Sequence, residues 1–211
     1  MRNDPRNSPN YSITEAASYL GIPAATLRFW VKGRGDLPGI IVPADKKSGG
    51  LSFFNLVEAH VLTSLRRHHG VTFQRIRRAT EYTAQSLGVD RPLLNQNFET
   101  DGLDIFVREL GRLINVSRHG QLAIRDVMNH YLRRVERDAH GVPIKLRPMF
   151  SGGVIIDPGI SFGRPVLIGT GIPIEEIADR FRGGDPIENI AEDLGVSLDA
   201  AEEAVRCQLA A

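Results

Sequence analysis

The segment Asp157–Ile174 constrains the fold of this chain more than any other stretch. Four of its eighteen residues are Gly and three are Pro, and most of the others are apolar. Pro fixes φ and removes a backbone donor, while Gly adopts backbone angles that strain other residues. We therefore expect short β pieces joined by tight turns. Three helices are then predicted from helical spacing and from Gly and Ser signals, over Glu175–Gly183, Pro186–Leu194 and Ser197–Leu209.

Charge is distributed unevenly along the chain. The net formal charge is +7 over residues 1–80, +1 over 81–149 and −7 over 150–211. A basic front and an acidic back indicate a polyanion as one partner and a basic protein face as another. The alternative is that the two ends attract each other within a dimer. The sequence has no run of ~18 apolar residues and no signal-peptide pattern, so we expect a cytoplasmic protein with no membrane segment.

Residues Tyr11–Trp30 have the spacing of a helix-turn-helix. Thr14 is the predicted N-cap of the first helix, Gly21 its left-handed stop, and Pro23 suits the first turn of the second helix. The following residues predict a hairpin, or wing, with strands at Gly39–Pro43 and Leu51–Phe54 around a turn at 45–50.

This winged helix-turn-helix predicts binding to double-stranded DNA. The first turns of the second helix would reach base edges and phosphates, and lysines at the wing tip would meet the backbone. For Arg28 the alternative is a structural salt bridge, and for the two wing lysines it is an ordinary solvated turn. The candidate DNA-binding residues are Ala24, Ala25, Thr26, Arg28, Lys32, Arg34, Lys46 and Lys47. A second basic cluster, Arg66–Arg67 with Arg75–Arg78, either touches flanking DNA or is a solvated helix face.

The middle of the chain is predicted to hold a small antiparallel sheet over Asn97–Ile124, a helix over Ala123–Asp138 and a strand over Pro143–Pro148. The expected fold class is mainly α with small β elements (α+β). The predicted domains are a winged helix-turn-helix at 1–88, a β-sheet and helix segment at 89–149, and a trihelical domain preceded by short β turns at 150–211.

No motif supports catalysis. The chain lacks G-x-S-x-G, a Walker A lysine, H-E-x-x-H and any paired cysteine motif. We therefore expect no enzyme activity, no cofactor and no metal site. The single Cys207 is expected to act as a small buried or interface residue.

Two sets of motifs resemble known families. Phe162-Gly163-Arg164-Pro165 and Gly169-Thr170-Gly171-Ile172-Pro173 resemble the domain of unknown function 433, although that family usually carries Arg where Gly171 stands. Thr26-Leu27-Arg28-Phe29-Trp30 resembles the Thr-Leu-Arg-Tyr-Tyr segment of MerR-type DNA-binding domains. The two halves occur in this order in VapBC-type antitoxins.

The resemblance implies an antitoxin of a type II toxin-antitoxin system. Its C-terminal domain would neutralise a PIN-like ribonuclease toxin, and its N-terminal domain would bind promoter DNA, as a homodimer, to autorepress the operon. The alternative for the arginines near a helix end is that they only complement the helix dipole. The candidate toxin-binding residues are Arg164, Arg180, Phe181, Arg182 and Arg206.

Two rival functions remain open at this point. One is a MerR-like, ligand-responsive transcription regulator without a toxin, in which the middle segment forms an effector pocket. The other is a purely structural dimeric adaptor.

Overall fold

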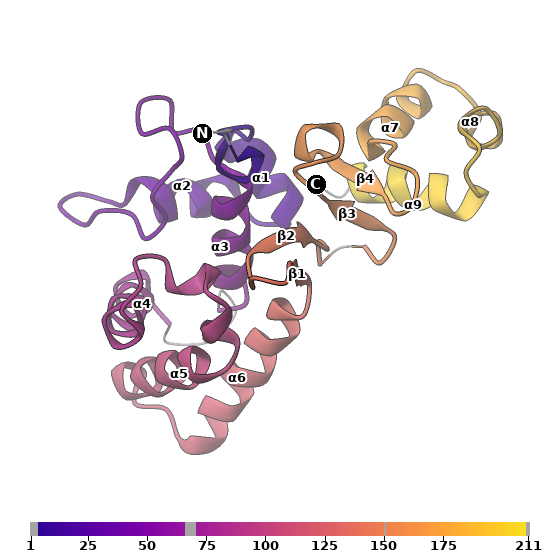
Figure 1. The fold of residues 1–211 in the computed structure, drawn as a ribbon. Helices are drawn as coiled ribbons and strands as arrows, with labels where there is room; N and C mark the ends of the chain where they lie inside the picture. Colours follow the sequence, from indigo (N-terminus) through magenta and orange to yellow (C-terminus); the bar gives the residue numbers. More distant parts are fainter. Residues whose placement is uncertain (1–3, 66–70, 150, 210–211) are drawn as a thin grey trace.

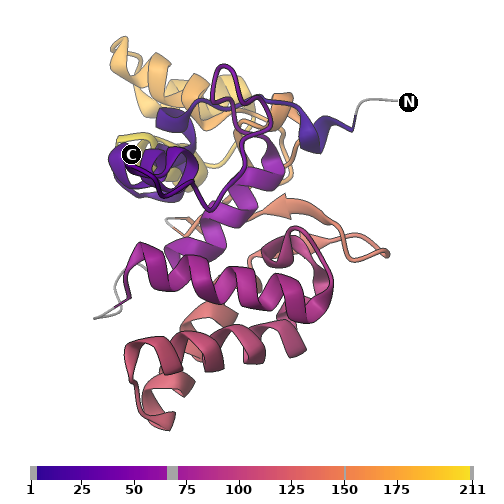
Figure 2. The same cartoon turned by 90° about the vertical axis from the view of Figure 1, so that its left-hand side faces the viewer.

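The computed structural model describes residues 4–65, 71–149 and 151–209. Nine α-helices and one four-stranded sheet form the described part of the chain, which confirms the predicted fold class. Helices α4 to α6 lie at one end of the molecule and α7 to α9 at the other, with the sheet between them (Figures 1 and 2). None of the described helices is long and apolar enough to cross a lipid bilayer.

The predicted helix-turn-helix forms from α1 (Ile13–Leu20) and α2 (Ala24–Lys32). The N-cap of α1 is Ser12 and not Thr14, because Ser12 and Glu15 form a reciprocal capping box. Gly21 ends α1 in the left-handed conformation, as predicted, with φ of 62°. Pro23 lies one residue earlier than predicted, at the N-cap of α2.

The two strands predicted for the wing do not form. The turn at 45–50 is present, closed by hydrogen bonds from the Gly49 amide and the Ser48 hydroxyl to Asp45. Other partners hold the backbone of both predicted strands. Leu51 pairs with Tyr11, and the Asn55 side chain donates to the Val42 carbonyl at 2.8 Å and accepts from the Ala44 amide at 3.0 Å. These backbone groups are the ones that a hairpin ladder would have used. The wing is therefore a loop tied to the next helix.

Helix α3 (Phe53–Thr63) is buried on every side over Phe53–Leu62. A helix without a wet face must be surrounded by other elements. It contacts α1 and α6, and strand β2, so it lies at the centre of the N-terminal two thirds (Figure 1). Helix α4 (Phe73–Leu87) follows with Thr72 at its N-cap, as predicted.

The sheet predicted over Asn97–Ile124 is wrong. Helices α5 (Asp101–Ile114) and α6 (Arg118–Leu132) occupy this region and pack against each other. Leu103, Phe106 and Leu110 recur at helical spacing and are fully buried. The helix predicted over Ala123–Asp138 begins earlier, at Arg118, and ends at Leu132, after which the chain turns into a strand.

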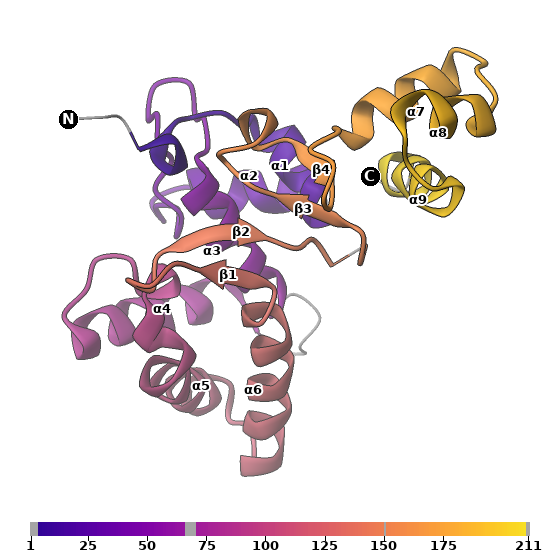
Figure 3. The ribbon, with the colours of Figure 1, turned by 45° about the vertical axis from the view of Figure 1, so that its right-hand side comes forward.

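The sheet is antiparallel, in the order β1 (Val135–Arg137), β2 (Pro143–Leu146), β3 (Val154–Ile156) and β4 (Pro165–Leu167). Strand β2 agrees with the strand predicted at Pro143–Pro148. Strands β1 and β2 continue from α6, while β3 and β4 lead into the C-terminal helices (Figure 3). The sheet thus joins the two ends of the molecule.

The C-terminal helices α7 (Ile174–Arg182), α8 (Ile187–Leu194) and α9 (Leu198–Leu209) follow the short β pieces, as predicted. They enclose a second core that includes Ile177, Ile190 and Ala204. Cys207 is buried there as expected, and burial raises the pKa of its thiol. A larger core extends from Tyr11 to Leu146 and includes Ile156. The predicted division of this larger unit at residue 88 stays a prediction.

Two hydrogen bonds join the N-terminal helices to the loop before β4. The Tyr11 hydroxyl donates to the Gly163 carbonyl at 2.9 Å in a buried position. The Asn10 side chain donates to the Phe162 carbonyl at 3.5 Å. Gly163 has φ of 80°, and a Cβ at this position would collide with the Tyr11 hydroxyl, so glycine is required for both reasons.

The buried imidazole of His60 makes the stability of the fold depend on pH. Its Nε2–H donates to the Tyr131 carbonyl at 3.0 Å, and burial lowers its pKa to about 4. Because the folded pKa lies below the unfolded value of about 6.5, stability is lost as pH falls from that value toward 4.

We expect His60 alone to lower the free energy of unfolding by about 3 kcal/mol between pH 7 and pH 4. Urea unfolding of the wild type and His60→Gln at both pH values measures this difference; equal losses in the two proteins would contradict it.

Candidate nucleic-acid interface

The exposed side of α2 gathers most of the residues predicted to bind DNA. Ala25, Arg28, Lys32 and Arg34 are exposed, whereas Thr26 is half-buried. Ala24 is also only half-exposed, because it packs against the main core. A shallow hollow of about 540 Å³ lies on this side of the helix. It is lined by Ala25, Thr26, Arg28, Phe29, Lys32, Gly33 and Arg34.

The cations of this hollow have no acidic partner in the described chain. Arg28, Lys32 and Arg34 form no ion pair with any residue that the structure describes. The structural salt bridge considered for Arg28 is therefore absent among these residues. Unpaired cations on one helix face are what the neutralisation of phosphates requires.

The turn of the wing lies beside the end of α2. A Cβ on Gly49 would be 4.0 Å from the Cε of Lys32, and both Lys46 and Lys47 are exposed on the same turn. A hydrogen bond from Ser48, with a second from the Lys47 amide, lowers the pKa of Asp45 and keeps this carboxylate ionised within the turn. Phosphate contacts from a turn of this kind would position a protein on a duplex without reading sequence.

One side chain of this face, Phe29, was not among the residues predicted to bind DNA. Phe29 lines the hollow and packs its ring against Phe73 of α4, with the ring centroids 4.1 Å apart. This contact holds α2 against α4, which also carries Arg75, Arg77 and Arg78. Arg77 of that cluster pairs with Glu81 at 2.7 Å and reaches the Pro38 carbonyl at 3.2 Å. Arg66 and Arg67 lie outside the described residues.

The arginines predicted to bind a toxin are all engaged within the chain. Arg180 bridges Asp185 at 2.9 Å and Asp193 at 2.7 Å, so it links α7 to α8. Arg182 pairs with Asp179 in its own helix at 2.6 Å. The other predicted residues are Arg164, paired with Glu175, Arg206, paired with Glu202, and Phe181, which is 41% exposed.

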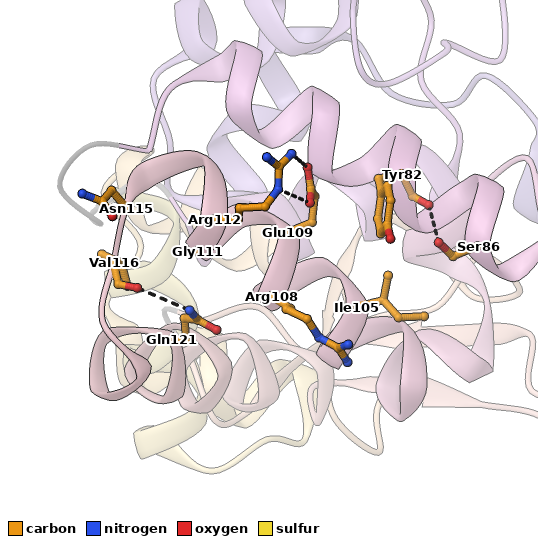
Figure 4. Close-up of a pocket in the computed structure, with 10 residues that line it drawn as sticks. All are labelled: Tyr82, Ser86, Ile105, Arg108, Glu109, Gly111, Arg112, Asn115, Val116 and Gln121. Atoms are coloured by element: carbon orange, nitrogen blue, oxygen red, sulfur yellow. Dashed lines mark hydrogen bonds and ion pairs between the residues drawn. The ribbon is translucent and has the colours of Figure 1, made fainter.

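A cavity of about 870 Å³ lies between α4, α5 and α6 (Figure 4). Tyr82 and Ile105 supply its apolar lining. Arg112 bonds to Glu109 at 2.9 and 2.6 Å, and this hydrogen bonding lowers the pKa of the Glu109 carboxyl. Arg108 points into the same region without an ion pair to any described residue. Such a lining suits an organic anion with an apolar part.

No cluster of three His, Cys, Asp or Glu side chains with metal-ligand geometry occurs within the described ranges.

Comparisons with known proteins agree with this division of the molecule. Residues 11–83 match the family described as MerR HTH family regulatory protein, and residues 154–206 match DUF433, a family described as a protein of unknown function. Residues 11–83 are therefore similar to a MerR-type domain, and residues 154–206 are similar to a DUF433 domain. The exposed cations of α2 lie in the first domain and the paired arginines of α7 to α9 in the second.

Relatives match over nearly the whole length of the chain. This chain is 29% identical over 223 residues to the "Putative antitoxin VapB45" of Mycobacterium tuberculosis, and the match covers 93% of this chain and 92% of that protein. It is 26% identical over 213 residues to the "Uncharacterized protein Rv2308" of the same organism, covering 92% and 88%. The crystal structure of Rv2018 from Mycobacterium tuberculosis superposes with a TM-score of 0.74 at 26% identity, covering 94% and 98%.

The difference between free and paired arginines predicts effects on stability of different size. Arg28→Ala should change the free energy of unfolding by less than about 0.5 kcal/mol, because the side chain is exposed and has no ion pair among the described residues. Arg180→Ala should lower the melting temperature, since it removes the ion pair from α7 to Asp193 of α8 and the ion pair to Asp185 in the turn between these helices. Thermal unfolding followed by circular dichroism measures both, and a larger loss in Arg28→Ala than in Arg180→Ala would contradict the assignment.

Proposed function

We propose that this chain is the antitoxin of a type II toxin-antitoxin system. Its DUF433 domain would bind and neutralise a PIN-like ribonuclease, and its MerR-type domain would bind the promoter of the shared operon, as a homodimer, in the cytoplasm. The observation that carries this proposal is the pairing of both domains in one chain that resembles an antitoxin over 93% of its length. No catalytic role is proposed for the chain itself.

The charge distribution supports this assignment of roles. The unpaired cations of α2 and the wing suit a polyanion. Residues 150–211 carry a net charge of −7, and their four arginines are all paired with carboxylates. Phosphates would be repelled from this part, whereas a protein that binds RNA through basic residues would be attracted to it.

For the toxin interface we propose the same five residues that the sequence analysis predicts, which are Arg164, Arg180, Phe181, Arg182 and Arg206. An arginine could enter the acidic metal site of a ribonuclease only by leaving its present partner. For Arg182 this partner is the exposed Asp179, and an exposed ion pair of this kind contributes little to stability, so the exchange costs little.

A second function is favoured by one observation, the cavity between α4, α5 and α6 (Figure 4). A MerR-like regulator that responds to a ligand would need such a cavity in its middle segment. The two proposals differ in whether the neighbouring gene encodes a PIN-like protein and in whether that protein binds this chain.

DNA binding can be tested by the salt dependence of affinity. With a fluorescent duplex from the region upstream of the gene, Arg28→Ala should weaken binding about tenfold or more, as expected when a base or phosphate contact of the recognition helix is lost. Lys46→Ala with Lys47→Ala should lower the slope of log affinity against log salt by about 1 to 2, because each lost phosphate contact removes about 0.9.

The matched control for this experiment is Arg206→Ala, which removes an exposed arginine from the acidic part of the chain. Its affinity and salt slope should equal those of the wild type. Equal loss of affinity in Arg206→Ala and Arg28→Ala would overturn the proposed DNA-binding face.

Neutralisation can be tested by co-expression with the product of the neighbouring gene. The two proteins should purify together, and the complex should cleave RNA at least tenfold more slowly than the ribonuclease alone, since a tightly bound antitoxin occupies or covers the active site. Arg182→Ala should restore part of the cleavage if the guanidinium enters the metal site. Absence of any complex, together with DNA binding that changes on addition of a small organic anion, would favour the ligand-responsive regulator.

A further inference from the structure

Phe162 is the most exposed of the large hydrophobic side chains in the described chain, with 83% of its surface accessible. Its backbone is also unusual, because Ser161, Phe162 and Gly163 are all left-handed, with φ of 46°, 57° and 80°. A bulky residue held there costs about 1 to 3 kcal/mol. The ring gains no burial in return. Both facts indicate that this position is selected for something other than the stability of the isolated chain.

The loop that carries Phe162, residues 160–163, is held firmly from two sides. The Ser161 hydroxyl donates to the Gly171 carbonyl at 3.0 Å, within the DUF433 domain. The Gly163 carbonyl accepts from the Tyr11 hydroxyl at 2.9 Å, from the MerR-type domain. The strained backbone is therefore held in place, and the ring is presented to solvent at a defined position on the surface. Aromatic side chains are common central contacts of binding interfaces, because they bury a large area with only two side-chain torsions to order.

Two carboxylates, Glu15 and Glu175, and one guanidinium, Arg164, lie near this loop. Arg164, two residues along the chain, pairs with Glu175 of α7 at 3.7 Å. Burial, with Glu15 and Glu175 nearby, raises the pKa of Tyr19 to about 12, and the Tyr19 ring packs edge-on against Tyr11 at 6.2 Å. Carboxylates of both domains therefore lie close to the Phe162 loop. Ile160, 38% exposed, adds a second apolar side chain.

From these observations we infer that Phe162 is the central contact through which the ribonuclease of the proposed function docks on this chain. The ring enters an apolar pocket in the basic, RNA-binding face of the ribonuclease, and the cations around that pocket face Glu15 and Glu175. This inference rests on the proposed function. It places the main contact at the junction of the two domains, rather than at Arg182 at the end of α7.

The test replaces the ring without disturbing the backbone. Asn and Gly tolerate left-handed angles, so Phe162→Asn and Phe162→Gly should fold and melt at or above the wild-type temperature. Both should bind the PIN-like ribonuclease encoded by the neighbouring gene at least tenfold more weakly in calorimetric titration, as loss of a buried aromatic contact does. The matched control is Leu122→Gln, which removes an exposed apolar side chain (54% exposed) from α6 and should bind like the wild type.

Each other outcome overturns the inference in a distinct way. If the wild type binds the ribonuclease and both Phe162 variants bind within twofold of it, the docking contact is elsewhere and the proposed function stands. If the wild type does not bind the ribonuclease, the proposed function fails together with the inference. If the variants melt at a lower temperature, or lose self-association in sedimentation while keeping the ribonuclease, the ring serves the fold or a second copy of this chain.

Discussion

The burial of helix α3 is the constraint on which the rest of the structure depends. Its residues Phe53–Leu62 have no wet face, so its three polar side chains must all find partners inside the protein. Asn55 bonds to the wing loop, Glu58 to Arg91 at 2.9 and 2.6 Å, and His60 to the Tyr131 carbonyl at the end of α6. Each bond ties a different segment to the same helix, which explains why the helix-turn-helix and the middle helices share one core.

The two ends of the molecule use their cations differently. Around α2 the exposed Arg28, Lys32 and Arg34 form no ion pair with any carboxylate in the described part of the chain, so their charge would be available to phosphate. In α7 to α9 the arginines hold helices together or pair along a helix, and the remaining free charge is negative. A single chain can in this way present a face for nucleic acid and a face for a basic protein. The buried bond from Tyr11 to Gly163 fixes how the two faces are oriented.

Local signals predicted the helices at the two ends better than the middle of the chain. Gly21 and Gly195 end their helices in the left-handed conformation, as their backbone preference predicts, whereas Pro23 lies at the N-cap of α2 and the two wing strands do not form. Gly102 and Gly120 were interpreted as turn residues of a sheet, but they lie inside α5 and α6. A Cβ on Gly102 would meet Leu87 of α4, a contact that exists only after folding. The candidate site residues differ in the same way. Helical spacing predicts that the cations of α2 are exposed, whereas the ion-pair partners of Arg180 depend on how α7 and α8 pack.

The most direct test of this division of roles is hydrogen–deuterium exchange of the full chain, once with promoter DNA and once with the ribonuclease. DNA should slow exchange in α2 and in the turn at 45–50 and leave α7 to α9 unchanged. The ribonuclease should slow exchange around Phe162 and in α7. Protection of α7 to α9 by DNA, or of α2 by both ligands alike, would contradict the separation of a nucleic-acid face from a protein face.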